Sequence, residues 1–332
     1  MTDGWHATLL PADATIRGAI ECLNDSGFQI AMIVDAERVL IGTVTDGDIR
    51  RGLLRGLNID EPVSSVINRD PLVAPGAIQT ETAINLMKAN RINQLPRVDE
   101  TRRVIGLFLW DKMFASSEEL LNEFVIMAGG QGVRLMPHTE NCPKPLLPVG
   151  DKPMMQHIIE RAVADGFRNF TISINYLGDM IIDHFGDGRQ LGVKIRYVRE
   201  TEPLGTGGSL GLIEQRPTHP FIVSNGDVLT GIRYSDLLHF HTTHRAKATM
   251  AIRSHEIQNA FGVVQTDGIN IVRFEEKPII RSQINAGIYV LEPDVLDHVN
   301  GTSRCDMPEI FEKIIARKGR VIAYPMHEPW VD

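Results

Sequence analysis

Residues 129–145 read GGQGVRLMPHTENCPKP and directly follow the apolar run Phe124–Ala128. An apolar run of this length that ends in glycines is typical of a buried strand turning into a loop. Glycines let backbone N–H groups approach phosphate oxygens without obstruction by a Cβ atom. Arg134 and Lys144 add two cations, and the prolines around Lys144 stiffen its segment. The pattern therefore predicts a strand followed by a polyphosphate-binding loop.

Strand-like and helix-like runs alternate after this loop. The expected strands are Asn169–Ile174, Val193–Val198 and Phe221–Ser224, and the expected helices are Met154–Ala164, Asp179–Phe185 and Gly207–Glu214. This alternation predicts a doubly wound, mostly parallel α/β sheet. Ligands of such sheets bind beyond the carboxyl ends of the strands.

Two further groups of residues are expected to be structural. His241 and His244 stand near the end of a predicted helix without a nearby cysteine, so we expect solvated histidines rather than a zinc site. Asp306 precedes Met307 and Pro308, which predicts a helix with Asp306 as its N-cap.

The first third of the chain contains an internal repeat. When the sequence is shifted by 64 positions against itself, Pro11 aligns with Pro75 and Val34-Asp35 aligns with Val98-Asp99. Each copy predicts a helix, two strands and a second helix, the first helices being Thr15–Ser26 and Glu81–Asn90. One copy of about 50 residues would bury too little core alone, so we expect the copies to pair.

This repeat resembles a tandem CBS-domain pair, with copies at about residues 5–55 and 68–115 of a unit spanning residues 1–118. The resemblance implies a regulatory nucleotide in the cleft between the copies, held by Thr45 and Asp48. The second copy has Leu109 and Lys112 at the matching positions. The alternative is that Thr45 and Asp48 only cap a helix.

Residues 119–332 resemble the sugar-1-phosphate nucleotidyltransferases, whose signature GGxGxRLxPxT…PKP is matched by residues 129–145. The resemblance implies a Rossmann-like nucleotidyltransferase domain after the CBS pair. It implies catalytic roles for Arg134, Lys144 and Lys277. The implied nucleotide-binding residues are Ala128, Gly129, Gly130, Gly132, Leu204, Gly205 and Thr206, and the implied sugar-binding residues are Gly226, Glu275, Asn285 and Gly287.

The same resemblance implies Mg²⁺ as cofactor, with Asp227 and Asp332 as its ligands. Asp332 belongs to a Trp-x-Asp motif that relatives continue into a short tail, so we expect this domain to lack its usual tail. Taken alone, Asp227 after a strand would indicate a turn, and Glu275 to Lys277 a solvated charged face.

The implied reaction joins a nucleoside triphosphate to a sugar-1-phosphate and releases pyrophosphate. A CBS pair fused to such a domain resembles the glucosamine-1-phosphate guanylyltransferases of legionaminic acid biosynthesis. Mannose-1-phosphate guanylyltransferases are similar in the transferase part. UTP or dTTP as donor, mannose-1-phosphate as acceptor, and a catalytically weak nucleotide-sensing protein remain alternatives.

Composition excludes several other classes of protein. A net charge of −8 disfavours a nucleic-acid partner. No apolar run approaches the roughly 20 residues that cross a membrane, and the N-terminus lacks a signal-peptide pattern. Three scattered cysteines fit a cytoplasmic location better than a disulfide framework. The two resemblances also imply a homo-oligomer.

Overall fold

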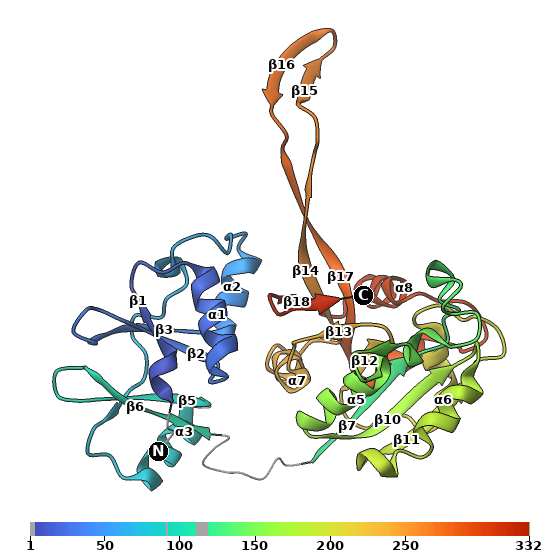
Figure 1. The fold of residues 1–332 in the computed structure, drawn as a ribbon, viewed down its shortest axis with the longest axis horizontal. Helices are drawn as coiled ribbons and strands as arrows, with labels where there is room; N and C mark the ends of the chain where they lie inside the picture. The colour runs from blue at the N-terminus through green and yellow to red at the C-terminus, as the bar shows by residue number, and fades with distance from the viewer. Residues whose placement is uncertain (1–3, 91, 111–118, 332) are drawn as a thin grey trace. The chain divides into compact units, whose positions relative to one another are not determined.

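The computed structural model describes residues 4–90, 92–110 and 119–331 of the chain. The chain divides into two compact units, residues 1–117 and 118–332 (Figure 1). Each unit is described by itself.

The first unit contains two three-stranded sheets of identical plan. One has the order β1 (Leu9–Pro11), β2 (Ile30–Val34), β3 (Leu40–Thr45), and the other β4 (Ala74–Pro75), β5 (Gln94–Val98), β6 (Val104–Leu109). In each sheet the first pair of strands is parallel and the second antiparallel. The repeat in the sequence is therefore a repeat in the structure.

The helices of this unit are α1 (Ile16–Ser26), α2 (Asp46–Leu54) and α3 (Thr80–Asn90), with short 3-10 helices η1 (Trp5–Thr8) and η2 (Val63–Ser65). An apolar cluster joins the two copies, because Met32 and Leu40 of the first pack with Val98 and Leu107 of the second. The predicted pairing of the copies is thus present. The second helix expected near Asp111 lies outside the described residues.

The second unit is built on a seven-stranded sheet with the order β11-β10-β7-β12-β17-β14-β18. Its strands are β7 (Leu120–Met127), β10 (Phe167–Ile174), β11 (Lys194–Arg199), β12 (Phe221–Asn225), β14 (Ala248–Gln258), β17 (Ile279–Leu291) and β18 (Val321–Met326). The four strands β11, β10, β7 and β12 are parallel, and β17 runs antiparallel to both of its neighbours. The predicted doubly wound sheet is confirmed.

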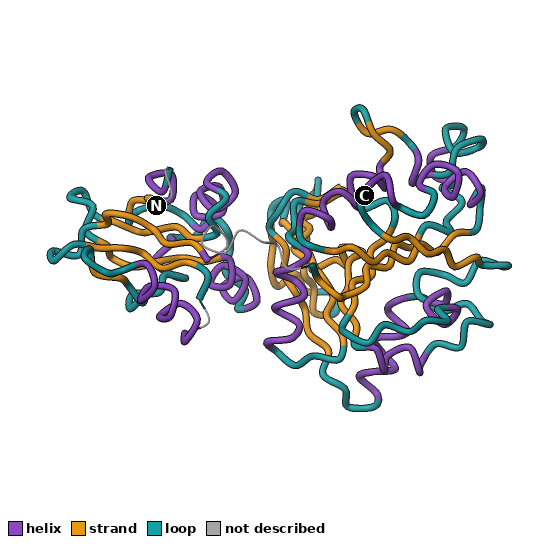
Figure 2. The backbone as a smooth tube through the Cα atoms, turned by 90° about the horizontal axis from the view of Figure 1, so that it is seen from below, coloured by secondary structure: helices purple, strands orange, loops and turns teal. Residues whose placement is uncertain are grey.

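Helices cover both faces of this sheet (Figure 2). On one face, α5 (Met154–Ala164), α6 (Gly178–Phe185) and α7 (Tyr234–Thr243) pack into one large apolar cluster. On the other face, α8 (Met307–Ala316) and the 3-10 helices η6 (Gly208–Leu212) and η7 (Pro293–His298) pack into a second cluster. Each cluster therefore fixes one layer against the sheet.

Short elements complete the unit. They are the hairpin β8 (Pro148–Val149) with β9 (Lys152–Pro153), the pair β13 (Leu229–Thr230) with β19 (Trp330–Val331), the hairpin β15 (Val263–Asp267) with β16 (Asn270–Glu275), and the 3-10 helices η3 (Val133–Leu135), η4 (Lys144–Leu146) and η5 (Arg189–Leu191). Within the described residues, no helix is long and apolar enough to cross a bilayer.

Two expectations differ from the structure. The helix expected at Gly207–Glu214 is only the 3-10 helix η6, because its glycines let it pack against another backbone; a Cβ on Gly211 would lie 2.2 Å from the nitrogen of Gly301. His241 is fully buried rather than solvated. It lies where α7 packs on β14, and its Nδ1 is 2.8 Å from the hydroxyl of Thr249.

Candidate active site

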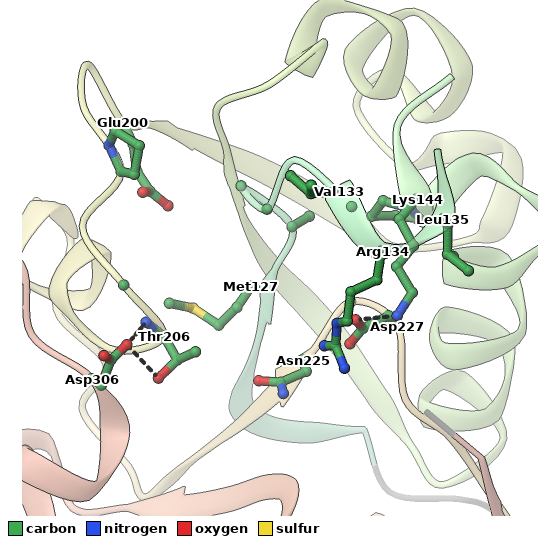
Figure 3. Close-up of a pocket in the computed structure, with 18 of the residues that line it drawn as sticks. Met127, Val133, Arg134, Leu135, Lys144, Glu200, Thr206, Asn225, Asp227 and Asp306 are labelled. Carbon is green, nitrogen blue, oxygen red and sulfur yellow. Dashed lines mark hydrogen bonds and ion pairs between the residues drawn. The ribbon is translucent and has the colours of Figure 1, made fainter. Parts of the chain in front are cut away.

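A cavity of about 460 Å³ opens at the carboxyl ends of the parallel strands of the second unit (Figure 3). Met127 and Ala128 end β7 at its base, and Asn225 to Asp227 follow β12 on one side. The glycine loop after β7, the segment of Lys144, the loop around Thr206 and the start of α8 complete its wall. This is the edge of the sheet at which an α/β fold binds its ligand.

Glycine is required at the turn of the predicted phosphate-binding loop. Gly132 has φ +61°, and a Cβ there would lie 2.8 Å from Cγ2 of Thr139. Thr139 is buried and donates its hydroxyl proton to the carbonyl of Gly132 at 2.9 Å. This closed turn leads into η3, which carries the exposed Arg134 at the cavity.

The second cation of the signature, Lys144, forms an ion pair inside the cavity. Its Nζ lies 2.7 Å from Oδ2 of Asp227, and the two side chains are 16% and 26% exposed. Pro143 and Pro145 flank Lys144 at the start of η4, which fixes the backbone on both sides. The structure thus brings together Lys144 and Asp227, although 83 residues separate them.

The loop Leu204–Thr206 is fastened to the start of α8. Oδ1 of Asp306 accepts hydrogen bonds from the backbone N–H of Thr206 at 2.9 Å and from its hydroxyl at 3.2 Å. The Thr206 hydroxyl in turn accepts from the N–H of Met307 at 2.9 Å. The donated N–H of Thr206 lowers the pKa of the Asp306 carboxyl. Asp306 also caps α8 as predicted, in a capping box with Glu309.

Glu200 is a cavity residue that the sequence reasoning did not single out. Its side chain is 8% exposed and lies next to Gly129, where a Cβ would approach Oε1 to 2.7 Å. Oε1 accepts from the hydroxyl of Ser173 at 2.6 Å, and Oε2 accepts from the N–H of Leu204 at 3.0 Å. The available signal was its position two residues after the expected strand Val193–Val198, at the start of the stretch that leads to the expected nucleotide-binding residues Leu204, Gly205 and Thr206.

The expected sugar-binding residues are divided between two places. Gly226 lines the cavity. Asn285 and Gly287 lie on β17 and do not line the cavity; Oδ1 of Asn285 accepts a hydrogen bond from the N–H of Gly287 at 2.9 Å. Gly287 has φ +75°, and a Cβ there would meet Nδ2 of Asn225 at 2.7 Å. This close approach explains glycine at that position.

Glu275 and Lys277 lie away from the cavity, on the ribbon formed by β14 to β17 beyond the sheet (Figure 1). Lys277 is exposed, with φ +46°. Among the described residues, none between 228 and 303 lines the cavity. The structure therefore does not bring Lys277 together with Arg134 and Lys144 within one chain.

The chemistry of Asp227 fits a hard divalent cation. Its carboxylate lines the cavity and pairs with the ammonium group of Lys144, and carboxylate oxygens are preferred ligands of Mg²⁺. Asp332, the second expected ligand, lies outside the described residues. Its neighbour Val331 is in β19, which pairs with Leu229 of β13, two residues after Asp227.

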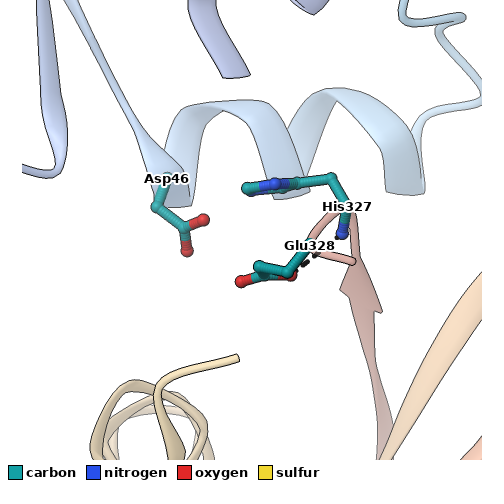
Figure 4. A group of neighbouring side chains, drawn as sticks. All are labelled: Asp46, His327 and Glu328. Carbon is teal, nitrogen blue, oxygen red and sulfur yellow. Dashed lines mark hydrogen bonds between the residues drawn. The ribbon is translucent and has the colours of Figure 1, made fainter. Parts of the chain in front are cut away.

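Another set of possible metal-binding side chains does not define a site. Figure 4 draws Asp46, at the start of α2, with His327 and Glu328, which follow β18. Asp46 belongs to the first unit and the other two residues to the second. Within the second unit, the N–H of His327 donates to Oε2 of Glu328 at 3.0 Å, so this carboxylate has a structural role in the turn.

In the first unit, Thr45 and Asp48 form a capping box at the start of α2. Oδ2 of Asp48 accepts from the N–H and the hydroxyl of Thr45, at 2.9 and 2.7 Å. Oδ1 pairs with Arg51. A cavity of about 440 Å³ beside Asp48 and Arg51 is also lined by Arg55 and Asn68. The capping role is therefore present, and Arg51 and Arg55 line the cavity beside it.

Comparison with known proteins agrees with this organisation. A family model described as nucleotidyl transferase matches residues 123–332, and the CBS domain model matches residues 6–55 and 63–113. The chain is 36% identical over 219 residues to "Probable mannose-1-phosphate guanylyltransferase 1" of Oryza sativa, covering 63% of this chain and 60% of that protein. It is 37% identical over 197 residues to the mannose-1-phosphate guanylyltransferase of Mycobacterium tuberculosis, covering 58% and 55%.

A solved structure from Bacillus anthracis, assigned as a glucose-1-phosphate thymidylyltransferase and bound to a sucrose, is similar in fold. The TM-score is 0.52 at 25% identity, over 63% of this chain and 89% of that one. The match to the curated relatives spans less than two thirds of their length. With a family model that covers well over half of its residues, this chain belongs to the nucleotidyl transferase family and carries a pair of CBS domains before that domain.

Proposed function

We propose that the protein transfers a guanylyl group from GTP to a hexose-1-phosphate, giving a GDP-sugar and pyrophosphate. An oxygen of the sugar phosphate attacks the α-phosphorus of GTP, and pyrophosphate leaves with the electrons of the broken P–O bond. The cavity supports this step through positioning and charge neutralisation, which carry most of the catalysis in phosphoryl transfer. The sugar is glucosamine-1-phosphate or mannose-1-phosphate, the second being the acceptor in the names of the curated relatives.

The phosphate part of the cavity suits a triphosphate. Gly129, Gly130 and Gly132 line the cavity, and the exposed Arg134 lines it beside them. In this proposal Arg134 binds the triphosphate, and Lys144 turns from Asp227 to the leaving pyrophosphate. Mg²⁺, held by Asp227 and Asp332, would neutralise charge on the phosphate oxygens.

The choice of guanine rests on Glu200. A carboxylate only accepts hydrogen bonds, and guanine presents two neighbouring donors, N1–H and the N2 amino group. Uracil and thymine present a single N–H between two carbonyl oxygens, which a carboxylate would repel. Glu200 has an 8% exposed side chain, and among the described residues no ion pair is formed by it. Each of its oxygens accepts one protein hydrogen bond, from Ser173 and from Leu204, which leaves lone pairs that can accept hydrogen bonds from a ligand. This is the single observation that carries the assignment.

A substrate panel tests the proposal. Pyrophosphate release with Mg²⁺ is measured for four nucleoside triphosphates, each with glucosamine-, N-acetylglucosamine-, glucose- and mannose-1-phosphate. We expect GTP to exceed the other donors by at least about 100-fold in kcat/KM, equivalent to about 2.7 kcal/mol. The isosteric variant Glu200→Gln should lose most of this preference. Equal use of UTP or dTTP by the wild type would refute the guanine assignment while keeping the reaction.

The same panel separates an enzyme from a nucleotide-sensing protein, since a sensor would bind nucleotides without releasing pyrophosphate. The CBS pair supports regulation by a nucleotide bound near Asp48 and Arg51. Initial rates with added adenine and guanine nucleotides test that part. The three free cysteines, Cys22, Cys142 and Cys305, support a cytoplasmic location, and the domain composition supports a homo-oligomer.

A further inference from the structure

Two buried carboxylates, one on each side of β10, each accept a hydrogen bond from a hydroxyl group of that strand. Thr171 donates its hydroxyl proton to Oε1 of Glu123. Ser173, two residues further along β10, donates to Oε1 of Glu200 at 2.6 Å. Glu123 also pairs with Arg196 at 2.8 Å and does not line the cavity, whereas Glu200 does (Figure 3). The two arrangements are alike in chemistry, and only the one at Ser173 reaches the cavity.

Ser173 is held in the interior of the sheet. The residue is 2% exposed, and β10 is paired on both sides at this point, with Met127 of β7 and with Val198 of β11 opposite Ser173. The N–H of Ala128 donates to the carbonyl oxygen of Ser173 at 2.9 Å. Because two neighbouring strands fix its backbone, the hydroxyl group of Ser173 is a stationary donor next to the cavity.

The carboxylate of Glu200 is contacted at both of its oxygens. Oε1 accepts from Ser173, and a Cβ on Gly129 would lie 2.7 Å from the same atom, so the glycine loop lies directly against this oxygen. Oε2 accepts from the N–H of Leu204 at 3.0 Å. The 2.6 Å separation at Ser173 falls in the range of a hydroxyl group that donates to an ionised carboxylate, which is a strong hydrogen bond. Of the two donors, Ser173 is the one that uses its side chain.

We propose that Ser173 is a positioning residue for base selection, which orients Glu200 so that both carboxylate oxygens accept hydrogen bonds from one guanine. This inference rests on the proposed function. Guanine presents N1–H and its N2 amino group side by side, and a carboxylate accepts from both only when its plane is aligned with that edge. A carboxylate that can rotate loses this paired geometry. Ser173 does not line the cavity itself, so its effect passes through Glu200.

Comparison of GTP with inosine triphosphate (ITP) tests this role. Hypoxanthine keeps N1–H and lacks the amino group, so the preference for GTP over ITP reports the second hydrogen bond of the pair. We expect the wild type to favour GTP at least about 30-fold in kcat/KM, because a site built to bind a donor rejects the analogue that lacks it. Ser173→Ala should reduce this preference to about 3-fold or less. The loss should appear as a higher KM for GTP at unchanged kcat, since the base lies away from the reacting phosphorus.

Two further variants and a binding measurement make the test specific. Ser173→Cys fills the same space with a weak donor and should show the same loss of preference. Thr171→Ala is the matched control, because Thr171 is also 2% exposed on β10 and its hydroxyl group donates to a carboxylate outside the cavity. This control should keep the wild-type preference. Calorimetric titration of the full chain with the Mg²⁺ complexes of GTP and ITP gives the same ratio without turnover. A general loss of structure would weaken the binding of both nucleotides alike.

An unchanged preference in both Ser173 variants, or an equal loss in Thr171→Ala, would overturn the positioning role. Glu200→Gln separates this outcome from failure of the proposed function. If Glu200→Gln loses the preference for GTP over ITP while the Ser173 variants keep it, Glu200 selects guanine and only the role of Ser173 is wrong. If the wild type prefers UTP or dTTP, the guanine assignment is wrong and the role of Ser173 in guanine selection is refuted with it.

Discussion

Replacing Lys144 by methionine should increase the affinity of the nucleotide-free protein for a divalent cation. The ammonium group of Lys144 lies 2.7 Å from Asp227, so a metal that binds this carboxylate must first displace it. Exposed ion pairs contribute up to about 1 kcal/mol, and breaking buried ones costs about 3–5 kcal/mol. With side chains 16% and 26% exposed, this pair lies between the two cases. We therefore take about 1–3 kcal/mol, which corresponds to binding about 5- to 140-fold tighter.

The measurement is a titration of the free protein with Mn²⁺, followed by the electron paramagnetic resonance signal of the unbound ion. Lys152→Met is the matched control, because Lys152 pairs with Glu160 at 2.8 Å and its loss changes the net charge equally. Turnover of Lys144→Met should fall, since the cation is also needed at the phosphates. Equal Mn²⁺ affinity of Lys144→Met and the wild type would show that Lys144 does not compete with the metal for Asp227.

Two further predictions concern stability and the phosphate loop. Burial lowers the pKa of His241 from 6.5 to about 4, so the folded state disfavours its protonated form. The free energy of unfolding should therefore keep its full value above pH 6.5 and fall by up to about 3 kcal/mol as the pH drops toward 4. Urea unfolding at several pH values measures this, and the free energy of His241→Phe should depend less on pH. Gly132→Ala should lower kcat/KM for GTP at least about 10-fold, because its Cβ would press on Thr139 2.8 Å away. Gly150→Ala is the control, because Gly150 has a similar φ of +67° and a Cβ there would meet open space. Comparable losses of kcat/KM in both variants would contradict this reasoning.

The features that sequence could predict are those encoded in short stretches of chain. The strand before the glycine loop and the cap at Asp306 depend on neighbours within a few residues. The pairing of the repeats is a long-range contact, but the internal repeat in the sequence made it predictable. The helix expected at Gly207–Glu214 was wrong because close backbone packing against residues near Gly301 decides its form. That packing comes from a part of the chain about 90 residues away, which local periodicity does not report.

The cavity also combines features set by a short stretch of sequence with features set by distant contacts. Gly129, Gly130, Gly132, Arg134 and Lys144 belong to one continuous motif, and all five line the cavity. Glu200 was missed, because a single acidic residue after a strand becomes informative only when Ser173 and Gly129 are seen around it. Burial of His241 likewise depends on a contact between α7 and β14. The outer parts of β14 and β17 lie beyond the sheet because β18 pairs with β14 only as far as Arg253 and β12 pairs with β17 only at Ile288–Leu291, which local sequence patterns do not report.

Under the proposed function, one end of the cavity binds the triphosphate and the other the nucleoside, and different contacts stabilise the two ends. On the phosphate side, the turn at Gly132 closes on Thr139 within a single segment of chain. On the nucleoside side, the loop at Thr206 depends on Asp306 and Met307 at the start of α8. Binding of the triphosphate group therefore does not depend on α8. Recognition of the base requires both the loop at Thr206 and the start of α8 to be in place. Disturbing the start of α8 should accordingly weaken base selection more than phosphate binding.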